Sequence, residues 1–435
     1  MNVQEYEYWI GKMMNMSPSF QQVGRVGYHP GMETIKAFDD FLGHPHRQFR
    51  SIHVAGTNGK GSVSHLLASV CSAHGCKTGL YTSPHLADFR ERIRIDGEMI
   101  TRQEVVDFFR RSREFIEQHH PSFFEITTAM AWDHFARHGV DVALIEVGLG
   151  GRLDSTNLIT PVLSVITSIG YDHCDLLGHT LPEIAKEKGG IIKSGVPVVL
   201  GSIQPELVPV FEELASHVQA PLFCSSQGQW EQIPQLLAEM DLKGAYQAAN
   251  LKTVFTALQV LEKTLFTANF RWQQEKVREA VCHAAQRTQF RGRWEHLHQE
   301  PEIICDIAHN EAGLRYTLDQ LLGQYEQGKA QGRYDRLVFI IGMVADKEID
   351  RVKDLFPVAD YYFTRAQGPR AMDASVLAGH LVEKARRCTV TASVTEALIT
   401  YFSQASPADL VYIGGSSYVV AEALQFPIFE KKAKN

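Results

Sequence analysis

The chain has 435 residues, 44% of them hydrophobic, and a formal net charge of -7 with a pI near 6.3. This length predicts two or three domains, and the acidic balance argues against nucleic acid or an anionic membrane as a partner. The cysteines are odd in number and form no Cys-x-x-Cys pair, which predicts reduced thiols rather than disulfides or a zinc knuckle. No apolar run reaches membrane length, so we expect a monomeric cytoplasmic protein with small-molecule partners.

A glycine-rich loop joins a predicted strand at residues 49–55 to a helix whose apolar residues recur at helical spacing. The loop reads Gly56-Thr57-Asn58-Gly59-Lys60-Gly61-Ser62. Glycines allow a sharp turn that points several N–H groups at one place, where a helix N-terminus favours phosphate. In such a loop Lys60 reaches the β- and γ-phosphates of a nucleotide, and Ser62 can meet a bound cation. A plain strand-to-helix connection is the alternative, and the motif's context favours phosphate binding.

Strands and helices alternate after this loop. Strands are predicted at residues 77–82, 140–147, 162–167 and 196–201, and helices at residues 101–118, 125–138 and around 184–188. This alternation predicts a mostly parallel sheet with helices on both faces. Between the first two of these strands lie Arg90, Arg92 and Arg94, which we interpret either as a solvated edge or as a carboxylate-binding loop.

Polar residues end several of these strands. Glu146 interrupts a buried strand, where an unpaired carboxylate is costly, and Ser83 and His173 follow two other strands. Ligands of an open α/β sheet bind beyond the carboxyl ends of its strands, so we expect these side chains to meet Lys60 at one edge. Taken singly, each has an ordinary explanation: a turn serine, an ion-paired glutamate and a hydrogen-bonded histidine.

The second half of the chain begins with a helix-rich stretch at residues 204–285, in which a long helix at 246–261 carries Asn250 near its start. Strands follow at residues 303–307, 337–343, 361–364 and 410–413, with helices between them. Asp306 to Asn310 place polar groups where a strand ends, although an Asn-capped helix start explains them equally. We therefore expect an α/β protein: an N-terminal P-loop-type domain with a mostly parallel sheet at 1–287, and a C-terminal Rossmann-like α/β domain at 288–435.

Together these motifs resemble the folylpolyglutamate synthase and dihydrofolate synthase family, within the wider Mur ligase group. The resemblance covers nearly the whole chain. The matching segments are residues 53–62, 82–86, 90–93, 146–157, 170–173, 187–193, 292–295, 306–310 and Asp346-Lys347. The chain departs from the family at Gly189, Arg291 and Ile307, where members generally have alanine, proline and glycine.

The resemblance implies an ATP-dependent, ADP-forming carboxylate-amine ligase that uses ATP and Mg²⁺. Such an enzyme phosphorylates the carboxylate of dihydropteroate or of a folate to an acyl phosphate, and then joins it to L-glutamate. Both dihydrofolate synthase and folylpolyglutamate synthase activities are implied, and folylpolyglutamate synthase activity alone is the alternative. The C-terminal domain is expected to close on ATP and glutamate, which would exclude water from the acyl phosphate.

Roles of individual residues are likewise implied by the resemblance. Ser83, Glu146 and His173 are expected to bind the metal ion, and Lys60, His173 and Lys188 to act in catalysis. Lys188 matches a lysine that can react with CO₂ to form a carbamate, and a protonated lysine paired with an anion is the alternative. Nucleotide contacts are expected from Asn58, Gly59, Lys60, Gly61, Ser62, Asn250, Arg293, Asp306 and His309. Substrate contacts are expected from Phe124, Glu125, Leu153, Asp154 and Ser155. Asp154 either accepts hydrogen bonds from a pterin or caps a turn.

Three rival functions are weaker. A GTPase would share the phosphate loop, but the chain has no Asn-Lys-x-Asp motif for guanine. A dinucleotide-binding oxidoreductase is suggested by Gly148 to Leu153, which lack the third small residue and a clear helix after them. A non-catalytic binding module would be excluded by ATP turnover that a folate stimulates.

Overall fold

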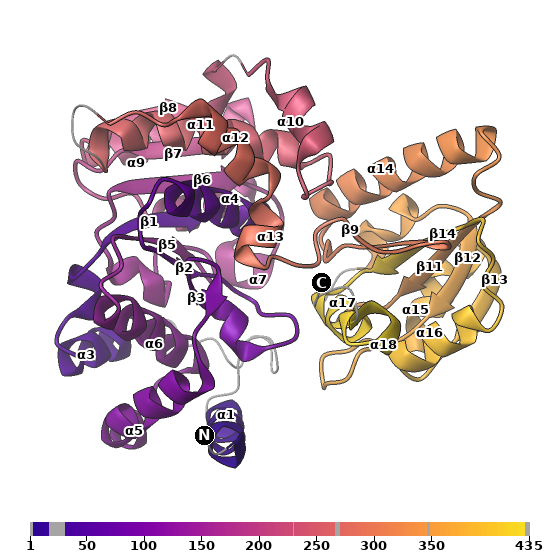
Figure 1. Ribbon diagram of the computed structural model, residues 1–435, viewed down its shortest axis with the longest axis horizontal. Coiled ribbons are helices and arrows are strands. Elements are labelled where there is room, and N and C mark those ends of the chain that lie inside the picture. Colours follow the sequence, from indigo (N-terminus) through magenta and orange to yellow (C-terminus); the bar gives the residue numbers. More distant parts are fainter. Residues whose placement is uncertain (1–2, 17–30, 229, 266–269, 346–348, 431–435) are drawn as a thin grey trace. The chain divides into compact units, whose positions relative to one another are not determined.

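The glycine-rich loop joins strand β1 (Arg50–Ala55) to helix α4 (Lys60–Ala73) in the computed structural model, which describes residues 3–16, 31–228, 230–265, 270–345 and 349–430. The chain divides into two units (Figure 1). The first contains Met1–Asp241 and Gln247–Phe290, and the second contains Leu242–Tyr246 and Arg291–Asn435. We expected a division between residues 287 and 288, and the roles of the two domains stay predictions. Asp346 and Lys347, part of the family resemblance, lie outside the described residues.

An eight-stranded sheet in the order β4-β3-β2-β5-β1-β6-β7-β8 organises the first unit. The strands are β2 (Thr78–Tyr81), β3 (Ile93–Ile95), β4 (Glu98–Met99), β5 (Val142–Glu146), β6 (Leu163–Ser168), β7 (Val198–Ser202) and β8 (Leu222–Cys224). Neighbours from β2 to β8 pair in parallel, and β3 and β4 add an antiparallel edge. The predicted, mostly parallel sheet is therefore confirmed.

Helices cover both faces of this sheet, as its strongly apolar strands require. Besides α4, the helices of this unit are α1 (Val3–Met16), α3 (Glu33–Phe41), α5 (Arg102–His119), α6 (Phe123–Arg137), α7 (Cys174–Leu177), α8 (Leu181–Gly189), α9 (Val208–His217), α10 (Ile233–Glu239), α11 (Gln247–Thr264), α12 (Gln274–Cys282) and α13 (Ala284–Thr288). Ala143 and Ile145 of β5 belong to the core that α1, α3, α5 and α6 build. Helix α4 packs against β1, β2, β5 and β6 and against α11, α12 and α13.

The second unit has a six-stranded sheet in the order β13-β12-β11-β14-β10-β9, in which only β9 is antiparallel. Its strands are β9 (Glu295–Gln299), β10 (Glu302–Cys305), β11 (Arg336–Ile341), β12 (Ala359–Phe363), β13 (Ala385–Val390) and β14 (Asp409–Gly414). Its helices are α14 (Glu311–Ala330), α15 (Ala374–Leu381), α16 (Val394–Phe402), α17 (Ser417–Leu424) and α18 (Pro427–Glu430). The second α/β domain predicted from the sequence is therefore present.

The arginine-rich segment before and within β3 is packed inside the first unit. Arg92 and Arg94 are only 2% and 3% exposed. Arg92 donates to Nδ1 of His85 at 2.8 Å, and its guanidinium group lies 5.0 Å from the ring centre of Phe123. Arg94 donates to Oε1 of Gln289 at 3.4 Å. The interpretation of this segment as a solvated edge is wrong for both residues, because their stems and charges are held by packing and hydrogen bonds.

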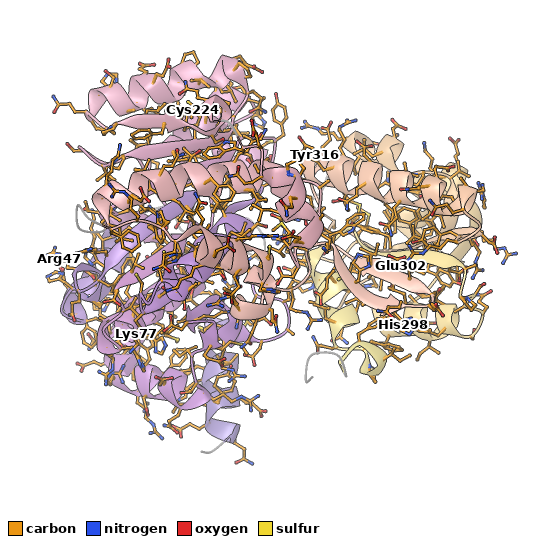
Figure 2. The ribbon with its side chains drawn as sticks, turned by 45° about the horizontal axis from the view of Figure 1, so that its top comes forward. Arg47, Lys77, Cys224, His298, Glu302 and Tyr316 are labelled. Carbon is orange, nitrogen blue, oxygen red and sulfur yellow. The ribbon has the colours of Figure 1, made fainter. Side chains whose placement is uncertain are left out.

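Glu302, labelled in Figure 2, lies at the start of β10 and contacts several polar side chains. It accepts hydrogen bonds from Tyr334, from Arg333 at 2.6 Å and from Gln324 at 2.9 Å, and His296 lies 3.1 Å away. Burial alone would raise the pKa of Glu302, but His296, Tyr334 and Arg333 lower it to about 2. A depressed carboxyl pKa stabilises the folded state above the unfolded pKa, and this stability is lost as the pH falls towards 2.

We expect Glu302→Gln to lower the free energy of unfolding at pH 7 by about 1–3 kcal/mol, since buried donors lose a charged acceptor. Urea unfolding at several pH values checks this. The variant should also lose less stability than the wild type between pH 4.5 and the lowest pH at which the protein stays folded. Glu326→Gln, an exposed change on α14, is the control. Equal pH dependence in the wild type and in Glu302→Gln would contradict the expectation.

Candidate active site

Four neighbouring parallel strands, in the order β2-β5-β1-β6, end at one edge of the first sheet. Ser83 follows β2, Glu146 is the last residue of β5, the glycine-rich loop follows β1, and His173 follows β6. Oε2 of Glu146 accepts a hydrogen bond from the backbone N–H of Ser83 at 3.0 Å. The topology thus brings the predicted residues of the first unit to the edge where ligands of such sheets bind.

The end of β6 holds the glycine-rich loop in shape. The N–H of Thr57 donates to Ser168 O at 2.8 Å, and the N–H of Asn58 donates to Ser168 Oγ at 3.0 Å. The hydroxyl of Thr167 donates to Asn58 O at 2.6 Å. We did not predict these roles for Thr167 and Ser168 from the sequence. The sequence did carry a signal for them, since two hydroxyl residues in succession end a mostly apolar strand.

Two lysines converge on one carbonyl oxygen of the loop. Nζ of Lys60 donates to Gly56 O at 3.1 Å and to Thr57 O at 3.2 Å, and Nζ of Lys188 donates to Gly56 O at 2.9 Å. Lys188 is 5% exposed, and burial, followed by the charge of Lys60, lowers the pKa of Lys188 to about 7. The ammonium group of Lys60, together with the protonated fraction of Lys188, places positive charge at this oxygen, which favours an anion such as phosphate at the loop.

Helix α11 contributes amide side chains beside the same loop. Gly59, at φ 87°, is the N-cap of α4, and a side chain there would collide with the amide of Asn250. Nδ2 of Asn250 donates to Gln247 Oε1 at 2.7 Å, and Gln247 donates in turn to Ser62 Oγ at 3.3 Å. Asn250 therefore lies beside the loop, as a nucleotide contact would require. Gln247 had no signal in the sequence, because 185 residues separate it from Ser62.

His173 begins α7 in the left-handed conformation, with φ 52°, and its side chain is 31% exposed. Its N–H donates to Oδ1 of Asp172 at 3.0 Å, and its Nε2 lies 3.8 Å from that oxygen. The negative charge of Asp172 also acts to raise the pKa of Lys188, against the larger effect of burial. Asp172 was not among the predicted site residues, although it directly precedes His173.

A divalent cation fits the groups at this edge. Glu146 is 4% exposed, and its Oε1 lies 3.9 Å from the Cβ that a side chain at Gly61 would have, at the start of α4. A buried carboxylate beside the glycine-rich loop offers the kind of oxygen ligand that Mg²⁺ prefers. The hydroxyls of Ser62 and Ser83 are of the same donor type, whereas His173 offers nitrogen, which is unusual for this cation.

The residues predicted to contact substrate lie on the loop after β5 and at the start of α6. The side chain of Glu125 closes a capping box by accepting from Ser122 N at 2.7 Å. The ring of Phe124 occupies the space that a side chain at Gly148 would need. Leu153 is partly exposed, and Ser155 is 9% exposed. Contacts of these residues with a substrate stay predictions.

Asp154 makes several hydrogen bonds within its own loop. Oδ1 accepts from Thr156 N at 3.0 Å and from Thr156 Oγ1 at 2.5 Å, while Oδ2 accepts from Leu149 N at 2.8 Å. Burial raises the pKa of Asp154, although these hydrogen bonds oppose the shift. Asp154 therefore caps its turn, which is one of the two roles that the sequence left open. A contact with a pterin would be a second role of the same carboxylate.

We expect Asp154→Ala to lower the free energy of unfolding by about 2–4 kcal/mol, because it leaves several buried donors without an acceptor. Asp154→Asn, which keeps one acceptor oxygen, should lose less. Urea denaturation of the three proteins measures both effects. If Asp154→Ala is as stable as the wild type but no longer binds a pterin, the side chain acts on the ligand rather than as a cap.

In the second unit, Asp306 follows β10 and is 2% exposed. Its carboxylate accepts from Tyr246 Oη at 2.7 Å, from Trp294 N at 2.8 Å and from Ala308 N at 2.8 Å. Burial raises the pKa of Asp306, and the charge of Arg293 opposes this. Nδ1 of His309 lies 3.0 Å from Ile307 O. Asn310 caps α14, which is the alternative that we considered from the sequence. Nucleotide contacts of Arg293, Asp306 and His309 stay predictions.

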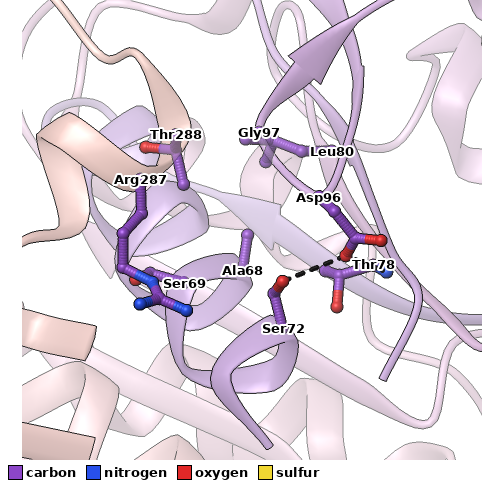
Figure 3. A pocket seen from close by; sticks show the side chains of 9 residues that line it. All are labelled: Ala68, Ser69, Ser72, Thr78, Leu80, Asp96, Gly97, Arg287 and Thr288. Atoms are coloured by element: carbon purple, nitrogen blue, oxygen red, sulfur yellow. Dashed lines mark hydrogen bonds between the residues drawn. The ribbon is translucent and has the colours of Figure 1, made fainter. Parts of the chain in front are cut away.

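A separate cavity of about 140 Å³ lies in the first unit, between α4 and the segments around β2, β3 and α13 (Figure 3). Ser72 donates to Oδ1 of Asp96 at 3.0 Å on its wall. The residues that line it are Ala68, Ser69, Ser72, Thr78, Leu80, Asp96, Gly97, Arg287 and Thr288. None of the predicted site residues is among them, so this cavity is not the predicted nucleotide site.

Known domain families account for both halves of the chain. Residues 54–200 match the Mur ligase middle domain, and residues 292–417 match the glutamate ligase domain of Mur ligases. The first match contains the glycine-rich loop, Glu146, His173 and Lys188, and the second contains Asp306. The fold and the loop therefore define an ATP-dependent ligase of the Mur type.

Similar proteins show to which family of Mur ligases the chain belongs. The chain is 34% identical to the folylpolyglutamate synthase of Lacticaseibacillus casei over 385 residues, which cover 81% of this chain and 85% of that protein. The chain belongs to the folylpolyglutamate synthase and dihydrofolate synthase family. It is also 30% identical, over 92% of its length, to a Halobacterium salinarum protein named probable bifunctional folylpolyglutamate synthase/dihydropteroate synthase, of which it spans 50%.

Solved structures agree with this assignment. Escherichia coli FolC in complex with DHPP and ADP has a TM-score of 0.81 and 26% identity, and the match covers 99% of this chain and 98% of that one. The Yersinia pestis bifunctional folylpolyglutamate synthase/dihydrofolate synthase with Mn, AMPPNP and L-glutamate bound has a TM-score of 0.79 and 26% identity, with 97% of each chain covered. Among the described residues, no helix is long and apolar enough to cross a membrane.

Proposed function

We propose that this chain uses ATP and Mg²⁺ to join L-glutamate to dihydropteroate and to folates, as a bifunctional dihydrofolate synthase and folylpolyglutamate synthase. The observation that carries the proposal is the convergence of Lys60 and Lys188 on Gly56 O, at the sheet edge that also holds Glu146. A carboxylate does not react with an amine until an oxygen is made a good leaving group. Positive charge at the loop is suited to the phosphoryl transfer that achieves this.

The proposed reaction has two steps, a phosphoryl transfer and the formation of an amide bond. A carboxylate oxygen of the acceptor attacks the γ-phosphorus of ATP, the bond to the β-phosphate oxygen breaks, and ADP and an acyl phosphate result. The amino nitrogen of glutamate then attacks the acyl carbon, inorganic phosphate leaves, and the nitrogen loses a proton. Lys60 stabilises the negative charge on the transferring phosphoryl oxygens. A bound Mg²⁺ ion supplies further charge neutralisation, and Glu146, Ser83 and His173 are the residues proposed to hold it.

Other roles in the proposal follow the family resemblance. Asn58, Gly59, Gly61 and Ser62 direct backbone and hydroxyl groups at the phosphates, and Asn250 lies beside them. Phe124, Glu125, Leu153, Asp154 and Ser155 form the acceptor region, and Arg293, Asp306 and His309 contact the nucleotide. We propose that the chain acts as a monomer in the cytoplasm. Its seven unpaired cysteines agree with the proposed compartment, where thiols stay reduced.

One assay tests the proposal. Purified protein is given ATP, Mg²⁺ and L-glutamate with dihydropteroate, with tetrahydrofolate, or with neither, and both ADP and the glutamylated product are measured. We expect product with each acceptor and little ADP without one. Turnover with tetrahydrofolate alone would leave folylpolyglutamate synthase as the sole activity. ADP formation that no acceptor stimulates would overturn the proposed ligase reaction.

A further inference from the structure

Three side chains with metal-ligand atoms meet where α5 and α6 lie side by side in the first unit (Figure 1). Glu104 is in the first turn of α5, His134 is in the last turn of α6, and His138 is the C-cap of α6. Nε2 of His138 lies 2.6 Å from Glu104 Oε1, and Nδ1 of His134 lies 3.7 Å from the same oxygen. One ligand atom from each residue lies within 4.8 Å of the other two.

The two imidazoles face the same way because of their spacing. Residues four apart on a helix project from one face, and the rings of His134 and His138 have centres 4.5 Å apart. Two histidines at this spacing, joined by a carboxylate from a second helix, can bind one ion from the same side.

Helix capping fixes the carboxylate of Glu104 towards these rings. Its Oε2 accepts from Thr101 N at 2.9 Å and from Thr101 Oγ1 at 2.6 Å, in the capping box that begins α5. The other oxygen, Oε1, is the one turned to the histidines. The cap therefore orients this ligand without any metal, as hydrogen bonds to ligand carboxylates do in metal sites.

We propose that Glu104, His134 and His138 form a binding site for a zinc-class divalent cation. Two imidazole nitrogens and a carboxylate oxygen suit Zn²⁺, whereas Mg²⁺ prefers oxygen alone. Zinc bonds of about 2.0–2.1 Å in tetrahedral geometry separate ligand atoms by about 3.3 Å. The observed separations of 2.6 and 3.7 Å lie on either side of that value. The third separation, between the ligand nitrogens of the two histidines, is within 4.8 Å, so side chains must move closer for all three atoms to bind one ion.

Space for a fourth ligand is present beside the three residues. They line a cavity of about 200 Å³ together with Asp107, Arg111 and other residues of α5 and α6. The side chain of His138 is 41% exposed, so an ion can reach the site from solvent. Asp133, also on the wall, is paired with Arg111 at 2.5 Å. Water is therefore the simplest fourth ligand, which gives three protein ligands and one open position.

Zinc titration of the full-length chain by calorimetry tests the proposal, with Mg²⁺ in excess so that the proposed catalytic metal site is occupied. The variants are His138→Ala, at a partly exposed position, and Glu104→Gln, which keeps an acceptor for the cap. The control is His217→Ala, an exposed histidine of α9 that lies 2.7 Å from Glu213 O of its own helix. Circular dichroism confirms that each variant is folded.

We expect the wild type and His217→Ala to bind one zinc ion at this site. His138→Ala and Glu104→Gln should bind that ion at least about tenfold more weakly. Zinc binding by the thiols contributes equally to all four proteins and cancels in the comparison. Zinc should also raise the melting temperature of the wild type and the control more than that of the variants, because it bridges two helices. Equal stoichiometry and affinity in all four proteins would reduce the cluster to a hydrogen bond between helices and overturn the proposal.

Discussion

Lys60→Ala is expected to lower ligase turnover by about 10³-fold or more while the protein stays folded. Electrostatic groups that act on the charge of a transition state contribute effects of this size. The fold should tolerate the change, because within the described part of the chain the lost hydrogen bonds join Nζ to two loop carbonyls, those of Gly56 and Thr57. We expect a loss of stability of about 1 kcal/mol.

The measurement is ADP release and product formation under saturating ATP and glutamate, together with thermal unfolding. Lys186→Ala on α8 removes an exposed lysine and serves as the matched control. Lys60→Ala should remain folded and inactive, while Lys186→Ala keeps normal turnover. If Lys60→Ala turns over at the wild-type rate, the glycine-rich loop is not the site of phosphoryl transfer.

Sequence patterns predicted the sheet edge well because the information is local. The strands before Ser83, Glu146 and His173 are short and mostly apolar, and β1 runs into a recognisable glycine-rich loop. Parallel strands share the edge at which they end. Their order in the sheet, β2-β5-β1-β6, is not written in any one segment. It arises when the helices between strands pack on the two faces.

Sequence patterns did not predict the places where charged side chains are buried or where strands are polar. Arg92 and Arg94 alternate with Ile93 and Ile95, a strand pattern that the charges obscured. Their burial depends on Phe123, His85 and Gln289, which only the fold brings near. The edge strands β9 and β13 are polar and partly exposed, so they lack the apolar run that marks a buried strand.

The local role of Asp154 illustrates a different limit. An aspartate after glycines fits both a turn cap and a ligand for a pterin, and the two uses need the same atoms. The structure shows the hydrogen bonds to Leu149 and Thr156, which depend on the path of the backbone through the loop. Residue type alone carries no information about that path.

Lys188→Ala is expected to lower turnover by about 10²-fold or more, and short carboxylates should restore part of the loss. Lys188 is buried against the loop, and its pKa is lowered to about 7, so near neutral pH a large fraction of the amine is uncharged. Only the uncharged amine can attack the carbon of CO₂, and loss of a proton then gives a carbamate with two oxygens. Such an anion would suit a hard cation that has an imidazole among its proposed ligands.

Rescue by formate or acetate distinguishes a missing anion from a missing ammonium group. We expect these ions to raise the activity of Lys188→Ala but not that of Lys60→Ala, which lacks a cation. A carbamate should also give a carbon signal by NMR when the wild type is supplied with ¹³C-labelled CO₂, and Lys188→Ala should lack it. Without rescue and without that signal, Lys188 acts as an amine or an ammonium group. Its bond to Gly56 O would then serve to hold the loop and to add positive charge beside Lys60.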